Sequence, residues 1–153
     1  GNSGMKYLAQ TIIVFVCLFG GVLPPVKACM GEIFPSEALV SAIIAVESSG
    51  RAKAVSSAGC RGLTQLSKLA WNEVMNIPYL PNVYNAELNK TACRHYLFRL
   101  KNHYLKDRYT LERLLVSWNG GISLLRAVNY DCSKMPRESK EFVHRVMERA
   151  GAM

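Results

Sequence analysis

Glu47 is the acidic side chain whose place in the sequence best suits acid–base chemistry. It follows apolar residues spaced at three and four positions along one helical face, which are Leu39, Ala42, Ile43 and Val46. Ser36 is a suitable N-cap and Gly50 a suitable residue after the last turn, so a helix is predicted between them. A carboxyl in the last turn faces the negative end of the helix dipole, and partial burial disfavours its charge. Both effects raise its pKa, so we expect Glu47 to be a general acid at neutral pH; the alternative is a solvated glutamate at a helix edge.

The segment after Glu47 supplies polar groups that could face its carboxyl. Residues 51–61 form a predicted polar loop, and a helix is predicted from Leu63 to Met75. Gln65 would then lie in the first turn of that helix and face the loop, where it either binds a ligand or is an ordinary exposed glutamine. Ser48 either holds the carboxyl of Glu47 by a hydrogen bond or bonds its own backbone, as helix-end hydroxyls often do.

Helical periodicity continues through the rest of the chain. Helices are predicted at 87–104, from Thr110 to Trp118, at 122–128, and around Phe142, with a loop at 129–136. Trp118 ends an apolar stripe, where a tryptophan is more often core than binding surface, and Asn119 stands before two glycines in a predicted turn. The sequence contains no convincing strand pattern and no repeat, so the predicted fold is all-α, a compact helical domain.

Four blocks of sequence, in order, resemble the lytic transglycosylases of the soluble (SLT) type, which are lysozyme-like enzymes. The first block is the stretch around Glu47, at 46–49 and 54–65, with its Glu-Ser pair and its Gly-Leu-x-Gln; the others lie at 85–97, 117–121 and 136–143. The chain departs from the family pattern at three positions. Thr64 stands in place of Met, which should alter the cleft wall, and Trp118 and Phe142 each stand in place of Tyr.

The resemblance implies a lysozyme-like fold and the cleavage of peptidoglycan. Glu47 would be the single catalytic acid and base: it would protonate the oxygen between N-acetylmuramic acid and N-acetylglucosamine, then take the proton of the muramic C6 hydroxyl, which closes a 1,6-anhydro ring. The resemblance assigns glycan binding to these matched positions: Ser48, Gly62, Leu63, Thr64, Gln65, Trp118, Asn119 and Phe142. It implies no metal and no cofactor. Asp107, Glu112 and Asp131 lie outside the matched blocks, so no second acid is obvious.

Three other functions stay open from the sequence. One is a goose-type lysozyme, which hydrolyses the same polymer; another is a non-catalytic glycan-binding module; the third is an accessory protein of a secretion, conjugation or pilus apparatus. Metal or nucleophile chemistry has less support. His95, His103 and His144 are scattered without the spacing of metal ligands, and there is no Gly-x-Ser-x-Gly motif.

The N-terminal residues predict an exported protein. Residues 1–4 precede Met5 and are interpreted as a cloning scar, residues 5–28 as a signal peptide cleaved after Ala28, and residues 29–153 as the transglycosylase-like domain. The alternatives are an uncleaved membrane anchor and a lipoprotein modified at Cys29. We therefore expect the domain to act in the periplasm or outside the cell.

Charge and cysteine content fit this export. Without residues 1–28 the chain carries 17 Lys and Arg against 11 Asp and Glu, a net charge of +6, which suits an anionic polymer such as a cell wall. We expect glycan strands of peptidoglycan as the partner, no nucleic acid, and a monomer. The four cysteines outside the signal peptide predict two disulfides whose pairing is open, and these are Cys29, Cys60, Cys93 and Cys132.

Overall fold

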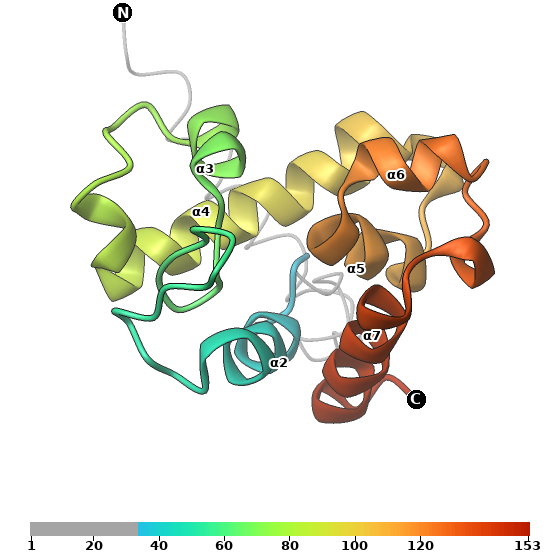
Figure 1. Ribbon diagram of the computed structural model, residues 1–153, viewed down its shortest axis with the longest axis horizontal. Helices are drawn as coiled ribbons and strands as arrows, with labels where there is room; N and C mark the ends of the chain where they lie inside the picture. Colours follow the sequence, from blue (N-terminus) through green and yellow to red (C-terminus); the bar gives the residue numbers. More distant parts are fainter. Residues whose placement is uncertain (1–33) are drawn as a thin grey trace, which may run out of the picture. The chain divides into compact units, whose positions relative to one another are not determined.

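The computed structural model describes residues 34–153, and these residues are all-α (Figure 1). The helices are α2 (Glu37–Ser48), α3 (Lys68–Val74), α4 (Ala86–Arg99), α5 (Leu111–Gly120), α6 (Ile122–Ala127) and α7 (Arg137–Ala150). Extended pairing in this part of the chain is limited to two isolated antiparallel bridges, Val55 with Arg61 and Arg61 with Leu66. The predicted all-α class is therefore confirmed.

The predicted signal peptide, its cleavage after Ala28, and Cys17 and Cys29 lie outside the described residues. Over residues 34–153, none of the helices combines the length and the apolar character that crossing a membrane requires.

Helix α2 forms as its sequence predicts. The Ser36 hydroxyl caps it by accepting a hydrogen bond from the Leu39 N–H at 3.2 Å. Leu39 and Ile43 are buried, as the predicted apolar face requires. The helix ends at Ser48, and the left-handed conformation expected just beyond it is taken by Ser49 and Gly50, with φ of 54° and 80°.

Helix α3 begins five residues later than the sequence pattern predicts. Gly62 and Gln65 have positive φ, 81° and 53°, which no right-handed helix accommodates. Ser67 supplies the real N-cap, because its hydroxyl accepts from the Ala70 N–H at 3.1 Å. Gln65 therefore lies in a loop and not in a first helical turn, and the prediction of a helix starting at Leu63 is wrong.

Helix α4 and its π-helical continuation, Leu100–Leu105, form the longest helical segment of the described chain (Figure 1). This segment is shared by two hydrophobic clusters. The larger cluster joins α4 to α2, α5 and α7, and the smaller one joins α4 to α3 and the connection after it. Tyr96 and Trp118 pack against both clusters. These two rings therefore lie at the boundary between the clusters.

The C-terminal helices follow the predicted order. Thr110 caps α5, as expected, by accepting from the Arg113 N–H at 3.1 Å. Gly121, with φ of 87°, separates α5 from α6, and a short 3₁₀ turn, Cys132–Lys134, precedes α7. Helix α7 packs along α2 and α5, so it joins the two ends of the described chain.

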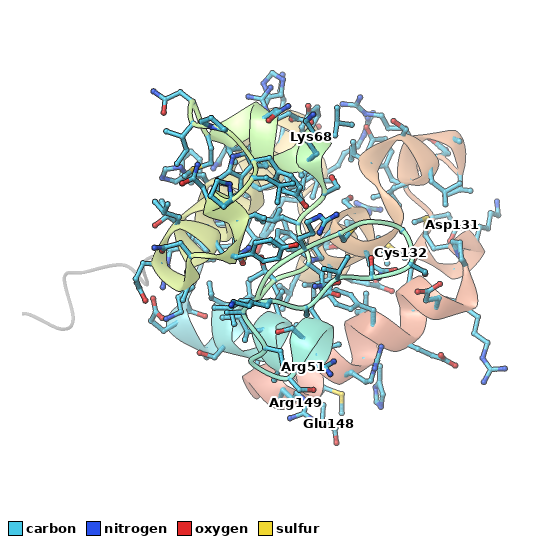
Figure 2. The ribbon with its side chains drawn as sticks, turned by 60° about the vertical axis from the view of Figure 1, so that its left-hand side comes forward. Arg51, Lys68, Asp131, Cys132, Glu148 and Arg149 are labelled. Atoms are coloured by element: carbon cyan, nitrogen blue, oxygen red, sulfur yellow. The ribbon has the colours of Figure 1, made fainter. Side chains whose placement is uncertain are left out.

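The three described cysteines are not joined to one another, contrary to the prediction of two disulfides. Cys60, Cys93 and Cys132 are free thiols, and any two disulfides among the four cysteines would have to join two of these three. The reason is their placement in separate parts of the fold. Cys93 is fully buried in α4, Cys60 lies in the loop after α2, and Cys132 lies beside Asp131 before α7 (Figure 2).

Candidate active site

An open cleft of about 480 Å³ lies where the two hydrophobic clusters meet. The end of α2, the loop after it, the start of α3, the middle of α4, the end of α5 and the start of α7 all contribute to it. Its walls are made by Glu47, Ser56, Ser57, Ala58, Cys60, Gln65, Leu66, Ser67, Leu69, Ala70, Tyr96, Ser117, Trp118, Asn119, Gly120, Gly121 and Glu138. Glu47, Gln65, Trp118 and Asn119 of the predicted site are thus brought together from three separate stretches of sequence.

Glu47 is half-buried in this cleft, and its pKa is raised from 4.5 to about 7. Burial is the main cause, because a carboxylate loses hydration there, and the charge of Glu138 adds to the rise. The hydrogen bond from Trp118 and the charge of Arg145 act in the opposite direction. The predicted rise is confirmed, with burial as its chief cause. Near neutral pH, Glu47 is divided between the acid that can donate a proton and the base that can accept one.

Trp118 connects the carboxyl to the aromatic boundary of the cleft. Its indole N–H donates to the Glu47 Oε1 at 3.1 Å, and its ring lies 5.7 Å from that of Tyr96, centroid to centroid, tilted by 60°. The side chain is half-buried, so it is both a core contact and a cleft wall.

The loop at 62–66 is held from behind by α4. The buried Asn89 accepts through Oδ1 from the Thr64 N–H at 3.0 Å and from the Thr64 hydroxyl at 2.8 Å, and its Nδ2 donates to the Val83 carbonyl at 2.9 Å. Thr64 is therefore buried behind the loop, and the expectation that it alters the cleft wall is wrong. Gly62 and Leu63 are buried as well, and a Cβ at Gly62 would clash with Asn89 and with the Val83 carbonyl.

Gln65 remains at the cleft although it is not helical. Its side-chain amide nitrogen donates to the carbonyls of Gly62, at 2.9 Å, and Ala54, at 3.2 Å. These bonds fix the amide plane against the loop. Asn119 also lines the cleft, and its Oδ1 accepts from the Ser139 hydroxyl at 2.8 Å.

Two more predicted ligands, besides Gly62, Leu63 and Thr64, do not line the cleft. The Ser48 hydroxyl donates to the Ile44 carbonyl at 3.3 Å, so the structure shows the backbone bond and not a bond to Glu47. Phe142 is only 1% exposed, within the larger hydrophobic cluster. Its helix face, which includes Val143 and Val146, is the one that packs inward, so Phe142 does not reach the cleft.

Glu138 is the acidic residue of the cleft that sequence reasoning missed. It lies in the matched block at 136–143, yet the search for a second acid considered only Asp107, Glu112 and Asp131, and none of these three lines the cleft. Its position at the first turn of α7 could have been read from Pro136, a common helix-start signal. Within residues 34–153, no group of three His, Cys, Asp or Glu side chains is arranged to hold a metal ion.

Comparison with known proteins identifies the family of the chain. A search of curated proteins finds no match to the chain. The family model described as the transglycosylase SLT domain matches residues 28–139, which is well over half of the chain and includes Glu47, the loop at 62–66 and the end of α5. The chain therefore belongs to the transglycosylase SLT domain family, within the lysozyme-like superfamily.

Proposed function

We propose that this protein is a lytic transglycosylase that cleaves the β-1,4 bond between N-acetylmuramic acid and N-acetylglucosamine and leaves a 1,6-anhydro end. Family membership supports peptidoglycan cleavage in general. The finer assignment is carried by one observation, the half-buried carboxyl of Glu47 with its pKa raised to about 7 inside an open cleft.

The first chemical step uses the protonated form of Glu47. Its proton passes to the glycosidic oxygen, the bond from muramic C1 to that oxygen breaks, and the N-acetylglucosamine part leaves as an alcohol. The positive charge left at C1 is taken up by the carbonyl oxygen of the substrate's own N-acetyl group. Because burial raises the pKa of Glu47 to about 7, its protonated form is present near neutral pH.

The second step uses the carboxylate that the first step leaves. Glu47 takes the proton of the muramic C6 hydroxyl, the C6 oxygen bonds to C1, and the acid is restored. The indole N–H of Trp118, 3.1 Å from Oε1, stabilises the ionised carboxyl between the two steps. An intramolecular hydroxyl also has an effective concentration far above that of any external nucleophile, on the order of 10⁵ M when well aligned.

Gln65, Trp118 and Asn119 are the predicted ligands that line the cleft, and we assign glycan binding to them. The proposed substrate lies outside the cytoplasm. We therefore also propose that the predicted signal peptide at 5–28 directs export, and that the domain acts as a monomer in the periplasm or outside the cell. A link to a secretion, conjugation or pilus apparatus is compatible with wall cleavage but draws no support from the cleft.

Hydrolysis is the second candidate, and Glu138 favours it. This residue places a second carboxylate in the cleft with Glu47. Glycosidases that use water commonly carry such a pair, one carboxyl as the acid and the other as the base that activates water. A goose-type lysozyme activity would then need Glu138 as that base.

Clearing of purified cell walls tests whether the chain is an enzyme. The chain should reduce the turbidity of a wall suspension, and Glu47→Gln should slow clearing at least about 10²- to 10⁴-fold. Glu112→Gln is the matched control, because Glu112 is exposed and away from the cleft and should clear walls at the normal rate. Binding of walls without clearing by the unaltered chain would indicate a glycan-binding module instead.

A further inference from the structure

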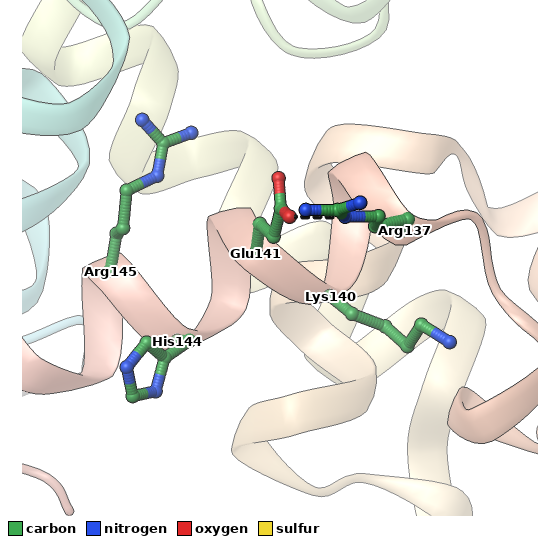
Figure 3. A pocket seen from close by; sticks show the side chains of 5 residues that line it. All are labelled: Arg137, Lys140, Glu141, His144 and Arg145. Carbon is green, nitrogen blue, oxygen red and sulfur yellow. Dashed lines mark hydrogen bonds and ion pairs between the residues drawn. The ribbon is translucent and has the colours of Figure 1, made fainter.

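Helix α7 borders a second, open hollow. It is lined by five polar side chains of that helix, Arg137, Lys140, Glu141, His144 and Arg145 (Figure 3). Glu138, which is the next residue after Arg137, lines the catalytic cleft itself. The same helix therefore contributes side chains to both hollows.

Two cations of this hollow, Lys140 and Arg145, have no acidic partner among residues 34–153, and of these two side chains only Lys140 has a hydrogen-bond partner there, the Ser133 carbonyl. Arg137, Glu141 and Arg145 project to one side of α7, and Lys140 and His144 to the other (Figure 3). The Arg137 Nε donates to the Glu141 Oε1 at 2.6 Å, so these two charges compensate each other. Arg145 forms no ion pair with any acid of residues 34–153.

Arg145 also acts on the catalytic carboxyl. Its positive charge lowers the pKa of Glu47, and α7 packs closely along α2, the helix that carries Glu47 in its last turn. The guanidinium is therefore close enough to Glu47 to influence its charge, while exposure leaves its donors available to a ligand.

We propose that Arg145 binds a carboxylate of the peptide attached to the glycan strand, and so makes the enzyme prefer peptide-bearing over bare glycan. The inference rests on the proposed function, because it requires a muramic acid residue at Glu47. That sugar carries its peptide on the lactyl group, and the peptide has free carboxylates. A guanidinium presents paired N–H donors that match a carboxylate in geometry and charge.

Binding measurements on the Glu47→Gln background test this inference without consuming the ligand. The ligands are a muramic acid–glucosamine tetrasaccharide with its peptides, the same tetrasaccharide freed of peptides by an amidase, and the peptide-bearing form with its carboxylates amidated. The Glu47→Gln chain should bind the first more tightly than the other two. Adding Arg145→Gln should weaken binding of the first about five-fold and leave the other two unchanged.

Two further variants sharpen the test. Arg145→Lys keeps the charge but loses the paired donors, so it should retain part of the preference. Lys140→Gln removes the same charge from another side chain of the hollow, whose ammonium donates to the Ser133 carbonyl at 3.1 Å, and should leave the preference intact. Equal weakening for all three ligands, an equal effect of Lys140→Gln, or no preference for the peptide-bearing ligand would each overturn the inference. Wall clearing by the chain, measured separately, decides the proposed function.

Discussion

The Glu47 carboxyl is held in an environment that the unfolded chain does not offer. Its pKa is about 7 in the fold against an ordinary value of 4.5, so the folded state binds the proton more tightly. Ionisation of a carboxyl whose pKa is raised in the folded state lowers the free energy of unfolding, and this lowering is the cost of ionisation. The cost is absent below about pH 4.5, grows as pH rises towards 7, and is complete above 7. The two pKa values correspond to about 3 kcal/mol at full ionisation.

Glu47→Gln should therefore stabilise the protein at alkaline pH. The amide has no proton to lose, so the free energy of unfolding of the variant should exceed that of the unaltered chain by up to about 3 kcal/mol at pH 8, and the difference should shrink towards pH 4.5. Urea unfolding at several pH values measures this difference. A difference that does not change with pH would contradict a raised pKa at Glu47.

Trp118→Phe should move the alkaline limb of the pH profile of kcat/KM to higher pH. The indole hydrogen bond lowers the pKa of Glu47, so its loss lets that pKa rise, and the acid then persists to higher pH. The limb of kcat/KM reports the pKa in the free enzyme. The matched control is Trp71→Phe, since the Trp71 indole donates to the Ile77 carbonyl and not to Glu47. It should lower stability without moving the limb, and a shift common to both variants would remove the special role of Trp118.

At the scale of residues, the sequence predicted the acid better than its neighbours. Glu47 could be placed because helical periodicity and a capping signal fix which side of α2 it occupies. Thr64 and Phe142 could not, because the direction of each side chain depends on distant partners. Asn89 draws the Thr64 hydroxyl behind the loop, and the packing of α7 turns Phe142 into the core.

Among the elements, α4 holds in place the loop that forms part of the cleft wall. Through Asn89 it bonds both the loop at 62–66 and the connection before the helix, at Val83. The loop itself has little regular pairing of its own, and two of its residues have positive φ. Its conformation therefore depends on buried hydrogen bonds to a helix that follows it by some 25 positions in the sequence.

Asn89→Ala should loosen this loop and destabilise the fold. It leaves the Thr64 N–H and the Val83 carbonyl buried without their partner, which should lower the free energy of unfolding by about 3 kcal/mol. Wall clearing should fall as well at temperatures where the variant remains folded, because Gln65 follows Thr64 directly. Chemical denaturation and hydrogen exchange of the loop amides give the two readouts.

Asn102→Ala is the control for this change. The exposed Asn102 side chain donates only to the Phe98 carbonyl one turn earlier in its own helical segment, so the free energy of unfolding should change by no more than about 0.5 kcal/mol. Equal effects of the two substitutions would show that Asn89 does not clamp the loop.

Helix positions were predictable where local signals and packing agree. Ser36 and Thr110 cap α2 and α5 as expected, because an N-cap acts on its own helix alone. The start of α3 was missed although Ser67 carries the same signal. The apolar spacing of Leu63 and Leu66 continues the stripe of α3, but both residues are buried from a loop, which periodicity does not distinguish from a helix.

For the whole molecule, the arrangement of two hydrophobic clusters about one long helix creates the cleft. The sequence predicted the order of the helices, since each has its own apolar stripe. It did not predict that Tyr96 and Trp118 would lie where the clusters meet, because this depends on how α4 and α5 cross. Nor did an even number of cysteines predict their separation, which keeps Cys60, Cys93 and Cys132 apart from one another.

The mass of the products tests the account most directly, because transglycosylation and hydrolysis differ by one water. Purified peptidoglycan is digested with the chain, and the released fragments are weighed before and after borohydride treatment. The account predicts fragments that end in 1,6-anhydromuramic acid, that lack the added water and that borohydride does not reduce. Fragments that carry the extra water and are reduced by borohydride would contradict it, and would identify a lysozyme in which Glu138 is the base to examine.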